Sequence, residues 1–259
     1  MKVNVAVISR WGPLPFWLYF IAIAIAELLT VYVYPLVGVI IYSMMLIAFI
    51  VQSVFVRDIK QRNLVLALCL VPLVRILSLS MPLGILSLVF RFPIIYLPLL
   101  AATIAVMWAT GLKPVDVGLT VCYWPWQVLL GVVSGIAIGV TEYLIIRPSP
   151  FISNLSWQQA WLPALILILS TGLVEELMFR GVLQKHAESM LGRQGIIYIS
   201  LIFAVLHAGF YSWGDVIFVF LVGLFFAAMV KRTGSLFGAI LSHGVANTVL
   251  FLVAPFILS

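Results

Sequence analysis

The chain has 259 residues, of which 64% are hydrophobic, and it carries only 14 Lys and Arg residues and 8 Asp and Glu residues. A soluble domain carries about a quarter of its residues as charges, so this chain has too few to coat a water-soluble globule. Together with a mean hydropathy of +1.25, this composition places the chain in a membrane. It also excludes a soluble nucleic-acid-binding protein, so the net charge of +6 is interpreted as a signal of membrane topology.

Runs of about 20 apolar residues predict helices that cross the hydrocarbon core. Nine such runs follow one another, at 14–34, 36–56, 64–80, 92–110, 125–146, 160–178, 196–212, 216–230 and 235–257. Pro82 and Gly84 interrupt the apolar segment between the third and fourth runs, which leaves the count at eight or nine. The predicted fold is an all-α, polytopic transmembrane helical bundle.

The positive charges gather on one side of this predicted bundle. With a cytoplasmic N-terminus, only Arg91 and Arg147 fall outside, and Arg75 lies within the membrane. Because cytoplasmic loops are enriched in Lys and Arg, this asymmetry predicts a cytoplasmic N-terminus. The residues assigned to the cytoplasmic side are Lys2, Arg10, Arg57, Lys60, Arg62, Lys113, Arg180, Lys185, Arg193, Lys231 and Arg232.

Polar residues within predicted spans are functional candidates because they are costly there. Glu175, Glu176 and Arg180 lie near the cytoplasmic end of the sixth run. Glu176 and Arg180 are four residues apart on one helix face and can pair, whereas Glu175 points elsewhere. An unpaired carboxylate in apolar surroundings is suited to act as a general base. The alternative is that all three form an interfacial cluster.

Two histidines also fall within predicted spans, each four residues from a partner. Phe203 can pack beneath the imidazole of His207, and His243 shares a helix face with Asn247. The second pair offers adjacent hydrogen-bond donors, which a developing oxyanion requires. Taken singly, an intramembrane histidine is more often a hydrogen-bonding link between helices than a catalytic group. Combined with Glu175, these groups suit either a carboxylate-activated water or a metal site with Glu and His ligands.

The three motifs closely resemble the signatures of the CPBP family of intramembrane proteases, which includes type II CAAX prenyl proteases and bacterial Abi proteins. The resemblance covers residues 155–257, and it implies an intramembrane glutamic-type endopeptidase. By analogy, Glu175 activates the attacking water with help from His207, while His243 and Asn247 stabilise the oxyanion. The supporting residues implied are Glu176, Arg180 and Phe203.

The resemblance also implies an organisation and a set of partners. Residues 151–259 would form the protease core, with four catalytic helices, and residues 1–150 would add transmembrane helices of unassigned role. The expected substrate is a membrane-associated or lipid-anchored peptide or protein in a bacterial or archaeal cell membrane, cleaved in a CAAX-like manner or processed at its C-terminal tail, with no nucleic acid involved. No cofactor is expected, because His207 and His243 lie on different helices without a His-Glu-x-x-His pattern. A metal-dependent protease remains an alternative, as does a non-catalytic scaffold, immunity or regulatory protein of the same fold.

The remaining polar residues give weaker expectations. Glu27 and Arg75 are expected to pair across helices, and Glu142 is expected to pair with Arg147 at a membrane face. A transporter with Glu27, Arg75 and Glu142 on a proton path ranks last, because those charges share no motif. His186 is expected to be solvated.

Two expectations concern packing and access. Gly131, Gly135 and Gly139 form a small-residue stripe, which predicts close packing of helices. If the three motifs meet, the pocket is expected below the membrane surface and open toward the cytoplasmic side.

Overall fold

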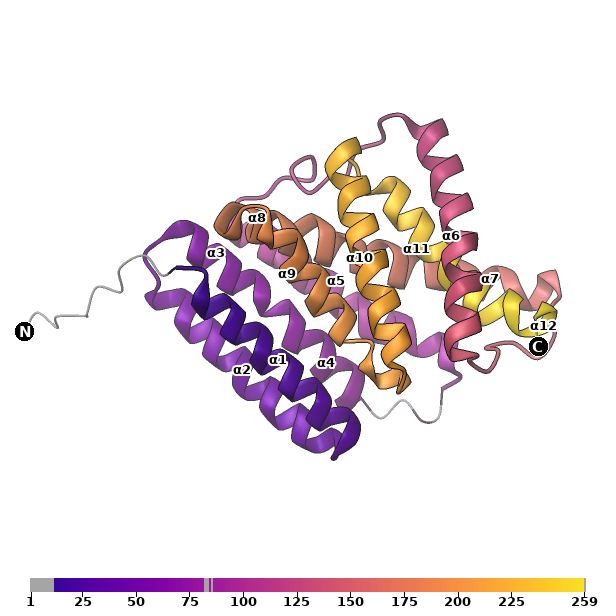
Figure 1. Ribbon diagram of the computed structural model, residues 1–259, viewed down its shortest axis with the longest axis horizontal. Helices are drawn as coiled ribbons and strands as arrows, with labels where there is room; N and C mark the ends of the chain where they lie inside the picture. Colours follow the sequence, from indigo (N-terminus) through magenta and orange to yellow (C-terminus); the bar gives the residue numbers. More distant parts are fainter. Residues whose placement is uncertain (1–11, 82–83, 85, 259) are drawn as a thin grey trace, which may run out of the picture.

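The computed structural model describes residues 12–81, 84 and 86–258 of the chain. Every regular element in these ranges is a helix, and eight helical runs are long and apolar enough to cross a membrane (Figure 1). A ninth apolar helix, Gln194–Phe210, is shorter. The prediction of an all-α polytopic bundle with eight or nine spans is therefore confirmed.

The described residues of the first half of the chain form five spans from six helices. Residues Ile59–Ser80 are one span built from two helices, the first of which is capped by the side chain of Asp58. Two prolines, Pro93 and Pro98, lie inside the fourth span. The elements are α1 (Leu14–Tyr32), α2 (Pro35–Phe55), α3 (Ile59–Leu68), α4 (Leu70–Ser80), α5 (Leu88–Thr110) and α6 (Trp124–Ile146).

The second half begins with one helical run of 35 residues, Trp157–Leu191. It is longer than the predicted run at 160–178. Its middle is a wide π-helix, and it continues into a further helix that packs on α3 and on α9 (Gln194–Val205). His186 in that last helix is consequently only 5% exposed, so the expectation that it is solvated is wrong. The run comprises α7 (Trp157–Leu167), η2 (Ile168–Glu175), η3 (Leu177–Leu183) and α8 (Gln184–Leu191).

Three more apolar segments complete the bundle. The first is the short ninth helix, which ends in a 3₁₀ turn, and the last again contains a π-helical stretch. The elements are α9 (Gln194–Val205), η4 (Ala208–Phe210), α10 (Trp213–Thr233), α11 (Phe237–Thr248), η5 (Val249–Val253) and α12 (Ala254–Ile257).

Glycines bring α11 into close contact with two neighbouring elements. A Cβ atom on Gly135 would lie 2.6 Å from the carbonyl oxygen of Ser242, and one on Gly139 would lie 2.4 Å from that of Ala246. On the other side, a Cβ atom on Gly172 of η2 would lie 2.7 Å from a carbonyl oxygen of α11. The predicted close packing of the glycine stripe on α6 is confirmed, and α11 is held between α6 and η2.

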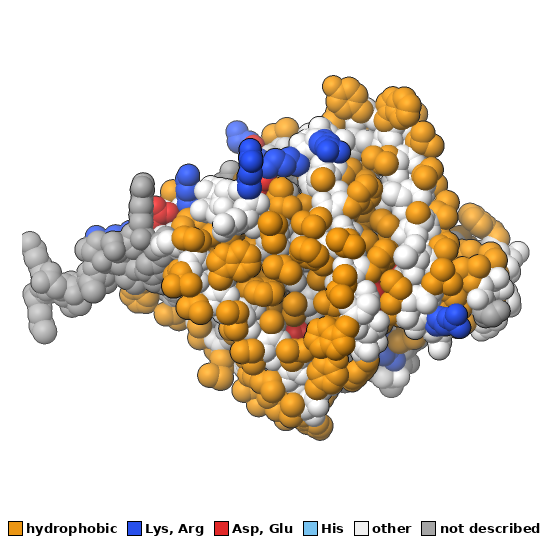
Figure 2. Space-filling model, viewed as in Figure 1, with side chains coloured by type: hydrophobic (Ala, Val, Ile, Leu, Met, Phe, Trp, Pro, Cys, Tyr) orange, Lys and Arg blue, Asp and Glu red, His pale blue; other side chains and the backbone are white. Residues whose placement is uncertain are grey.

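The outer surface is that of a membrane protein. Figure 2 shows apolar side chains over most of one face, with Lys and Arg side chains gathered along the upper edge, near α8 and the end of α10. Large apolar side chains are exposed along most of the spans, as contact with lipid requires. The chain is an integral, multi-pass membrane protein. Lys2, Arg10 and Pro82, which entered the predictions of topology and span number, lie outside the described residues.

Candidate active site

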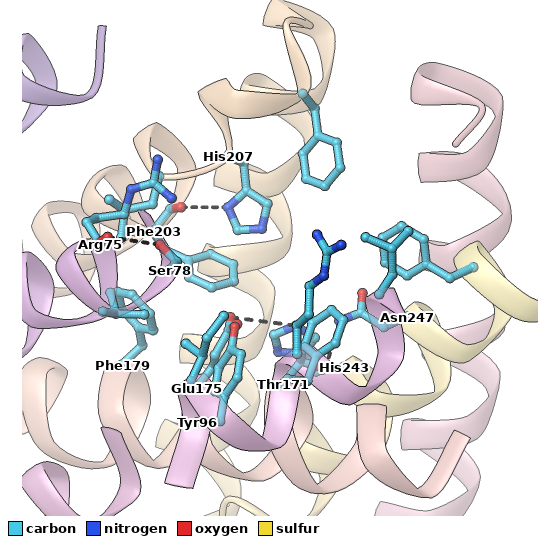
Figure 3. A pocket seen from close by; sticks show the side chains of 18 of the residues that line it. Arg75, Ser78, Tyr96, Thr171, Glu175, Phe179, Phe203, His207, His243 and Asn247 are labelled. Carbon is cyan, nitrogen blue, oxygen red and sulfur yellow. Dashed lines mark hydrogen bonds and ion pairs between the residues drawn. The ribbon is translucent and has the colours of Figure 1, made fainter. Parts of the chain in front are cut away.

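One cavity is lined by residues from all three motifs. It has a volume of about 350 Å³ and is lined by side chains from α4, α5, α6, η2, α9 and α11, together with neighbouring turns. Glu175, His207, His243 and Asn247 all line it, as does Phe203 (Figure 3). The other two motif residues, Glu176 and Arg180, lie behind this lining in the protein interior.

Glu176 and Arg180 form the expected ion pair, and it is fully internal. Arg180 donates from Nη1 to Glu176 Oε1 over 3.0 Å, and its guanidinium lies 4.2 Å from the centre of the Phe203 ring. Glu176 is 0% exposed and Arg180 is 4% exposed, so the two side chains lie in the protein interior and do not form an interfacial cluster. A second donor to the same carboxylate oxygen is His243, whose Nδ1 lies 2.8 Å away. The buried pair therefore anchors the His243 ring.

Glu175 presents its carboxylate to the cavity. Its Oε1 accepts a hydrogen bond from the hydroxyl of Tyr96 on α5, and its Oε2 lies 3.9 Å from His243 Nε2. That distance is too long for a direct hydrogen bond but short enough for both groups to contact one oxygen atom between them. His243 thus stands between the two glutamates, with Nδ1 toward Glu176 and Nε2 toward Glu175.

His207 lies just beyond the end of α9, at a separate part of the cavity wall (Figure 3). Its Nδ1 is 2.9 Å from the carbonyl oxygen of Phe203, to which it donates, so Nε2 is the free acceptor. The predicted packing of the two rings is confirmed, with centres 4.8 Å apart. Within the described part of the chain, His207 makes no ion pair or hydrogen bond with Glu175.

Asn247 is oriented by a residue that the sequence did not single out. Its Nδ2 donates to Thr171 Oγ1 over 2.8 Å, and Thr171 donates to the carbonyl oxygen of Leu167 over 2.7 Å. Thr171 lies on η2, one turn before Glu175, and both line the cavity. This chain of hydrogen bonds fixes the direction of the Asn247 carboxamide.

The first half of the chain contributes further lining residues. Tyr96, Arg75 and Arg91 reach the cavity from α4 and α5, and Glu142 reaches it from α6. In the sequence these residues lie within apolar spans, and no motif or spacing connects them with Glu175. The prolines on either side of Tyr96, Pro93 and Pro98, mark an irregular helix but do not point to a contact with Glu175.

Two expectations about these residues have opposite outcomes. The predicted pair of Glu27 and Arg75 is confirmed, since Arg75 donates to both carboxylate oxygens and Tyr42 donates to one of them over 2.8 Å. Glu142 instead is 7% exposed and faces the cavity, with no ion pair to Arg147 in the described chain. Residues five apart on a helix point roughly 140° apart, so these two face different directions.

The cavity opens at the end of the bundle opposite to the one expected. Its exposed lining residues, Leu88 and Phe210, begin α5 and end η4. Lys113 follows the other end of α5, and Lys231 lies at the other end of the bundle in α10. The expectation failed because the helix of Glu175 continues far past the predicted end of its span, and because His207 follows the end of α9.

Among the described residues, no group of three or more His, Cys, Asp and Glu side chains is arranged to hold a metal ion. The contacts around Glu175 are hydrogen bonds and a close imidazole. Such an arrangement can take a proton from a water molecule and can donate hydrogen bonds to an anionic oxygen.

Comparison with known proteins assigns the motif-bearing region. Residues 157–249 match a family model described as type II CAAX prenyl endopeptidase Rce1-like. Neither the curated proteins nor the solved structures gave a significant match. The matched segment runs from the start of α7 to the start of η5, so it contains all three motifs. The similarity of this chain to the Rce1-like type II CAAX prenyl endopeptidases therefore lies in this segment.

Proposed function

We propose that this protein is an intramembrane endopeptidase of the glutamic type, acting on a membrane-associated or lipid-anchored peptide or protein. The observation that carries the proposal is the environment of Glu175. This carboxylate faces a buried cavity, is held on one oxygen by Tyr96, and has His243 beside the other oxygen. A general base with an adjacent hydrogen-bond donor is what water-mediated hydrolysis of a peptide bond requires.

In the proposed reaction, Glu175 removes a proton from a water molecule while the water oxygen attacks the carbonyl carbon of the substrate. His207 accepts the second water proton in a hydrogen bond at its free Nε2, which orients the nucleophile. The carbonyl oxygen becomes the oxyanion of a tetrahedral intermediate. When the carbon–nitrogen bond breaks, the protonated Glu175 returns its proton to the leaving amine.

The oxyanion is assigned to His243 and Asn247. In its protonated form, His243 donates Nδ1–H to Glu176 and presents Nε2–H to the cavity. Asn247 uses one N–H on Thr171 and has a second available. Donors fixed in advance stabilise developing charge more effectively than donors that must reorient. Glu176, Arg180 and Phe203 contribute indirectly, by holding the imidazole rings of His243 and His207 in place.

The division of the chain into two parts is also a proposal. Residues 151–259 would supply the catalytic motifs, and residues 1–150 would complete the site. Tyr96 supports this second role, because it comes from α5 and contacts Glu175. A segment without residues 1–150 would lack this contact and part of the cavity wall.

The orientation in the membrane follows from the charge asymmetry. With the end that carries Lys113 and Lys231 in the cytoplasm, the N-terminus is cytoplasmic. The cavity then opens toward the opposite compartment of a bacterial or archaeal cell membrane, because Leu88 and Phe210 lie at the other end of the bundle. Substrate is therefore expected to arrive from that side.

The test of the proposed function compares Glu175→Gln with Glu188→Gln. Glu188 lies in the same helical run but pairs with Lys231 outside the cavity. Membrane fractions from cells producing each variant are analysed by mass spectrometry for peptides with new ends. Glu175→Gln should accumulate an uncleaved precursor, whereas Glu188→Gln should match the wild type. Normal processing by folded Glu175→Gln would exclude glutamic catalysis and favour a non-catalytic membrane scaffold.

A further inference from the structure

A second, apolar cavity lies against α5, η2 and η3. Its volume is about 540 Å³, and it shares no lining residue with the cavity of Glu175. Met107 and Leu177 are buried in its wall. Trp108 and Leu119 also line it, and Trp108 is 78% exposed. The cavity is therefore a groove that is open at the surface of the bundle.

The groove follows α5 through half of the membrane. Leu100, Ile104 and Trp108 line it at intervals of four residues, so they share one face of the helix. Leu100 is near the middle of α5, and Trp108 lies about 12 Å further along the helix axis. One leaflet is half of a hydrocarbon core of roughly 30 Å. The groove thus runs from the centre of the membrane toward its face, which is the direction of an acyl chain.

A single cation stands at the membrane-face end of the groove. Among the described lining residues, Lys113 is the only charged one, and it is exposed. No carboxylate of the described chain forms an ion pair with its ammonium group. The carboxylate of Asp116 instead accepts the backbone N–H of Lys113 over 2.9 Å. The ammonium group is therefore available to an anionic headgroup.

The inner wall of the groove belongs to the helical run that carries the catalytic motif. Leu173 of η2 and Leu177 of η3 line it. Glu175 lies between them in the sequence and lines the other cavity. On a different face, Gly172 brings η2 close to α11. A chain in the groove would pack on the outer face of the same run and limit its movement.

We propose that the groove binds one acyl chain of an anionic glycerophospholipid of the membrane, with its phosphate headgroup at Lys113. The apolar lining accounts for the chain, and Lys113 accounts for a preference for negative charge. With this end of the bundle in the cytoplasm, Lys113 faces the leaflet whose surface is negative. Binding of the lipid is independent of the proposed peptidase function, and only its effect on cleavage rests on that function.

The position of the groove favours a membrane lipid over the lipid anchor of a substrate. Leu88, at the mouth of the cavity of Glu175, begins α5, whereas Lys113 follows the end of this helix. The mouth and the groove therefore lie toward opposite faces of the membrane. An anchor in the leaflet next to the mouth would not extend into the groove.

Binding is measured on the purified full chain in detergent, with dioleoylphosphatidylglycerol and dioleoylphosphatidylcholine added separately. Native mass spectrometry gives the Kd of each lipid. Phosphatidylglycerol should bind about fivefold more tightly, as expected for one lysine beside an anionic headgroup. Lys113→Gln should lose this preference, whereas Lys185→Gln, which removes an exposed lysine of α8 outside the groove, should keep it. Equal affinities in the wild type, or an unchanged preference in Lys113→Gln, would overturn the proposal.

A second pair of variants tests where the chain lies. Ile104→Trp places a larger side chain in the groove, and Leu97→Trp adds the same ring at an exposed position of α5 outside it. Ile104→Trp should weaken binding of phosphatidylglycerol roughly tenfold, which corresponds to lost burial of about two methylene groups. Leu97→Trp should bind like the wild type. Wild-type affinity in Ile104→Trp that unfolds at the normal Tm would exclude the chain from the groove.

The effect on the catalytic run is measured as kcat for an N-palmitoylated octapeptide in vesicles. Adding phosphatidylglycerol to phosphatidylcholine vesicles should raise kcat about fivefold in the wild type and in Lys185→Gln but not in Lys113→Gln. An equal kcat in both kinds of vesicle would overturn this effect.

The lipid site and the peptidase function fail in distinguishable ways. Absence of cleavage in every vesicle, with binding that still depends on Lys113, would reject the peptidase and leave the lipid site standing. Cleavage without preferential binding of phosphatidylglycerol would reject the lipid site alone. Displacement of bound phosphatidylglycerol by the palmitoylated octapeptide would assign the groove to the anchor of the substrate and overturn the proposal.

Discussion

Replacing Tyr96 by Phe removes one hydroxyl group and keeps the aromatic ring. The hydroxyl donates to Glu175 Oε1, so its loss leaves that oxygen without its donor in a buried site. Hydrogen bonds to charged groups contribute about 1.5–3 kcal/mol. If the bond positions Glu175 for proton removal, the same amount is lost from the transition state, which is about 10- to 150-fold in rate.

The loss from Tyr96→Phe should appear in kcat, with KM nearly unchanged, because the hydroxyl orients the base and does not contact the substrate in the proposed mechanism. The assay follows cleavage of an N-palmitoylated octapeptide by purified protein, together with Tm. Tyr211→Phe is the matched control, since its hydroxyl donates to the carbonyl oxygen of Val31 away from the cavity. A kcat within twofold of wild type in folded Tyr96→Phe would refute the role of Tyr96.

Three further predictions concern packing, orientation and chemistry. Gly139→Ala should cost about 1–3 kcal/mol of stability, because its Cβ would lie 2.4 Å from the carbonyl oxygen of Ala246. Gly209→Ala, with open space around it, should unfold like the wild type, and an equal Tm for both variants would contradict close packing of α6 on α11. In a chain without its two native cysteines, Leu88→Cys on intact cells should react with a membrane-impermeant maleimide and Lys113→Cys should not; the reverse pattern would invert the proposed orientation. Cleavage should persist in excess chelator, and complete loss that added metal restores would support the metal-dependent alternative.

Hydropathy predicted the spans well because it depends only on residues that are neighbours in the sequence. The pairing of Glu176 with Arg180 could also be predicted, because residues four apart on a helix lie on the same face. The ion pair of Glu27 and Arg75 followed from a different principle. Two opposite charges in a chain so poor in charge have few other partners, and the structure joins them.

Contacts between helices that are far apart in the sequence could not be predicted from hydropathy or from spacing within one helix. Nothing local connects Tyr96 with Glu175, or Thr171 with Asn247, because both contacts depend on how the helices pack. Glu142 was misplaced for the same reason. Its neighbour in sequence, Arg147, suggested a surface pair, whereas the face of α6 that carries Glu142 turns toward the cavity.

The wide helix that carries Glu175 has a consequence for the register of the chain. In a π-helix each hydrogen bond spans one residue more than in an α-helix, so such a stretch holds a residue that a regular helix would not accommodate. Deleting one residue within Ile168–Glu175 would let the backbone close into an α-helix. A deletion between Thr171 and Glu175 would leave these residues three apart, about 300° of turn in an α-helix, so they would no longer share a face and Thr171 would lose its place beside Asn247. The length of this segment is therefore as much a requirement of the site as the identity of its side chains.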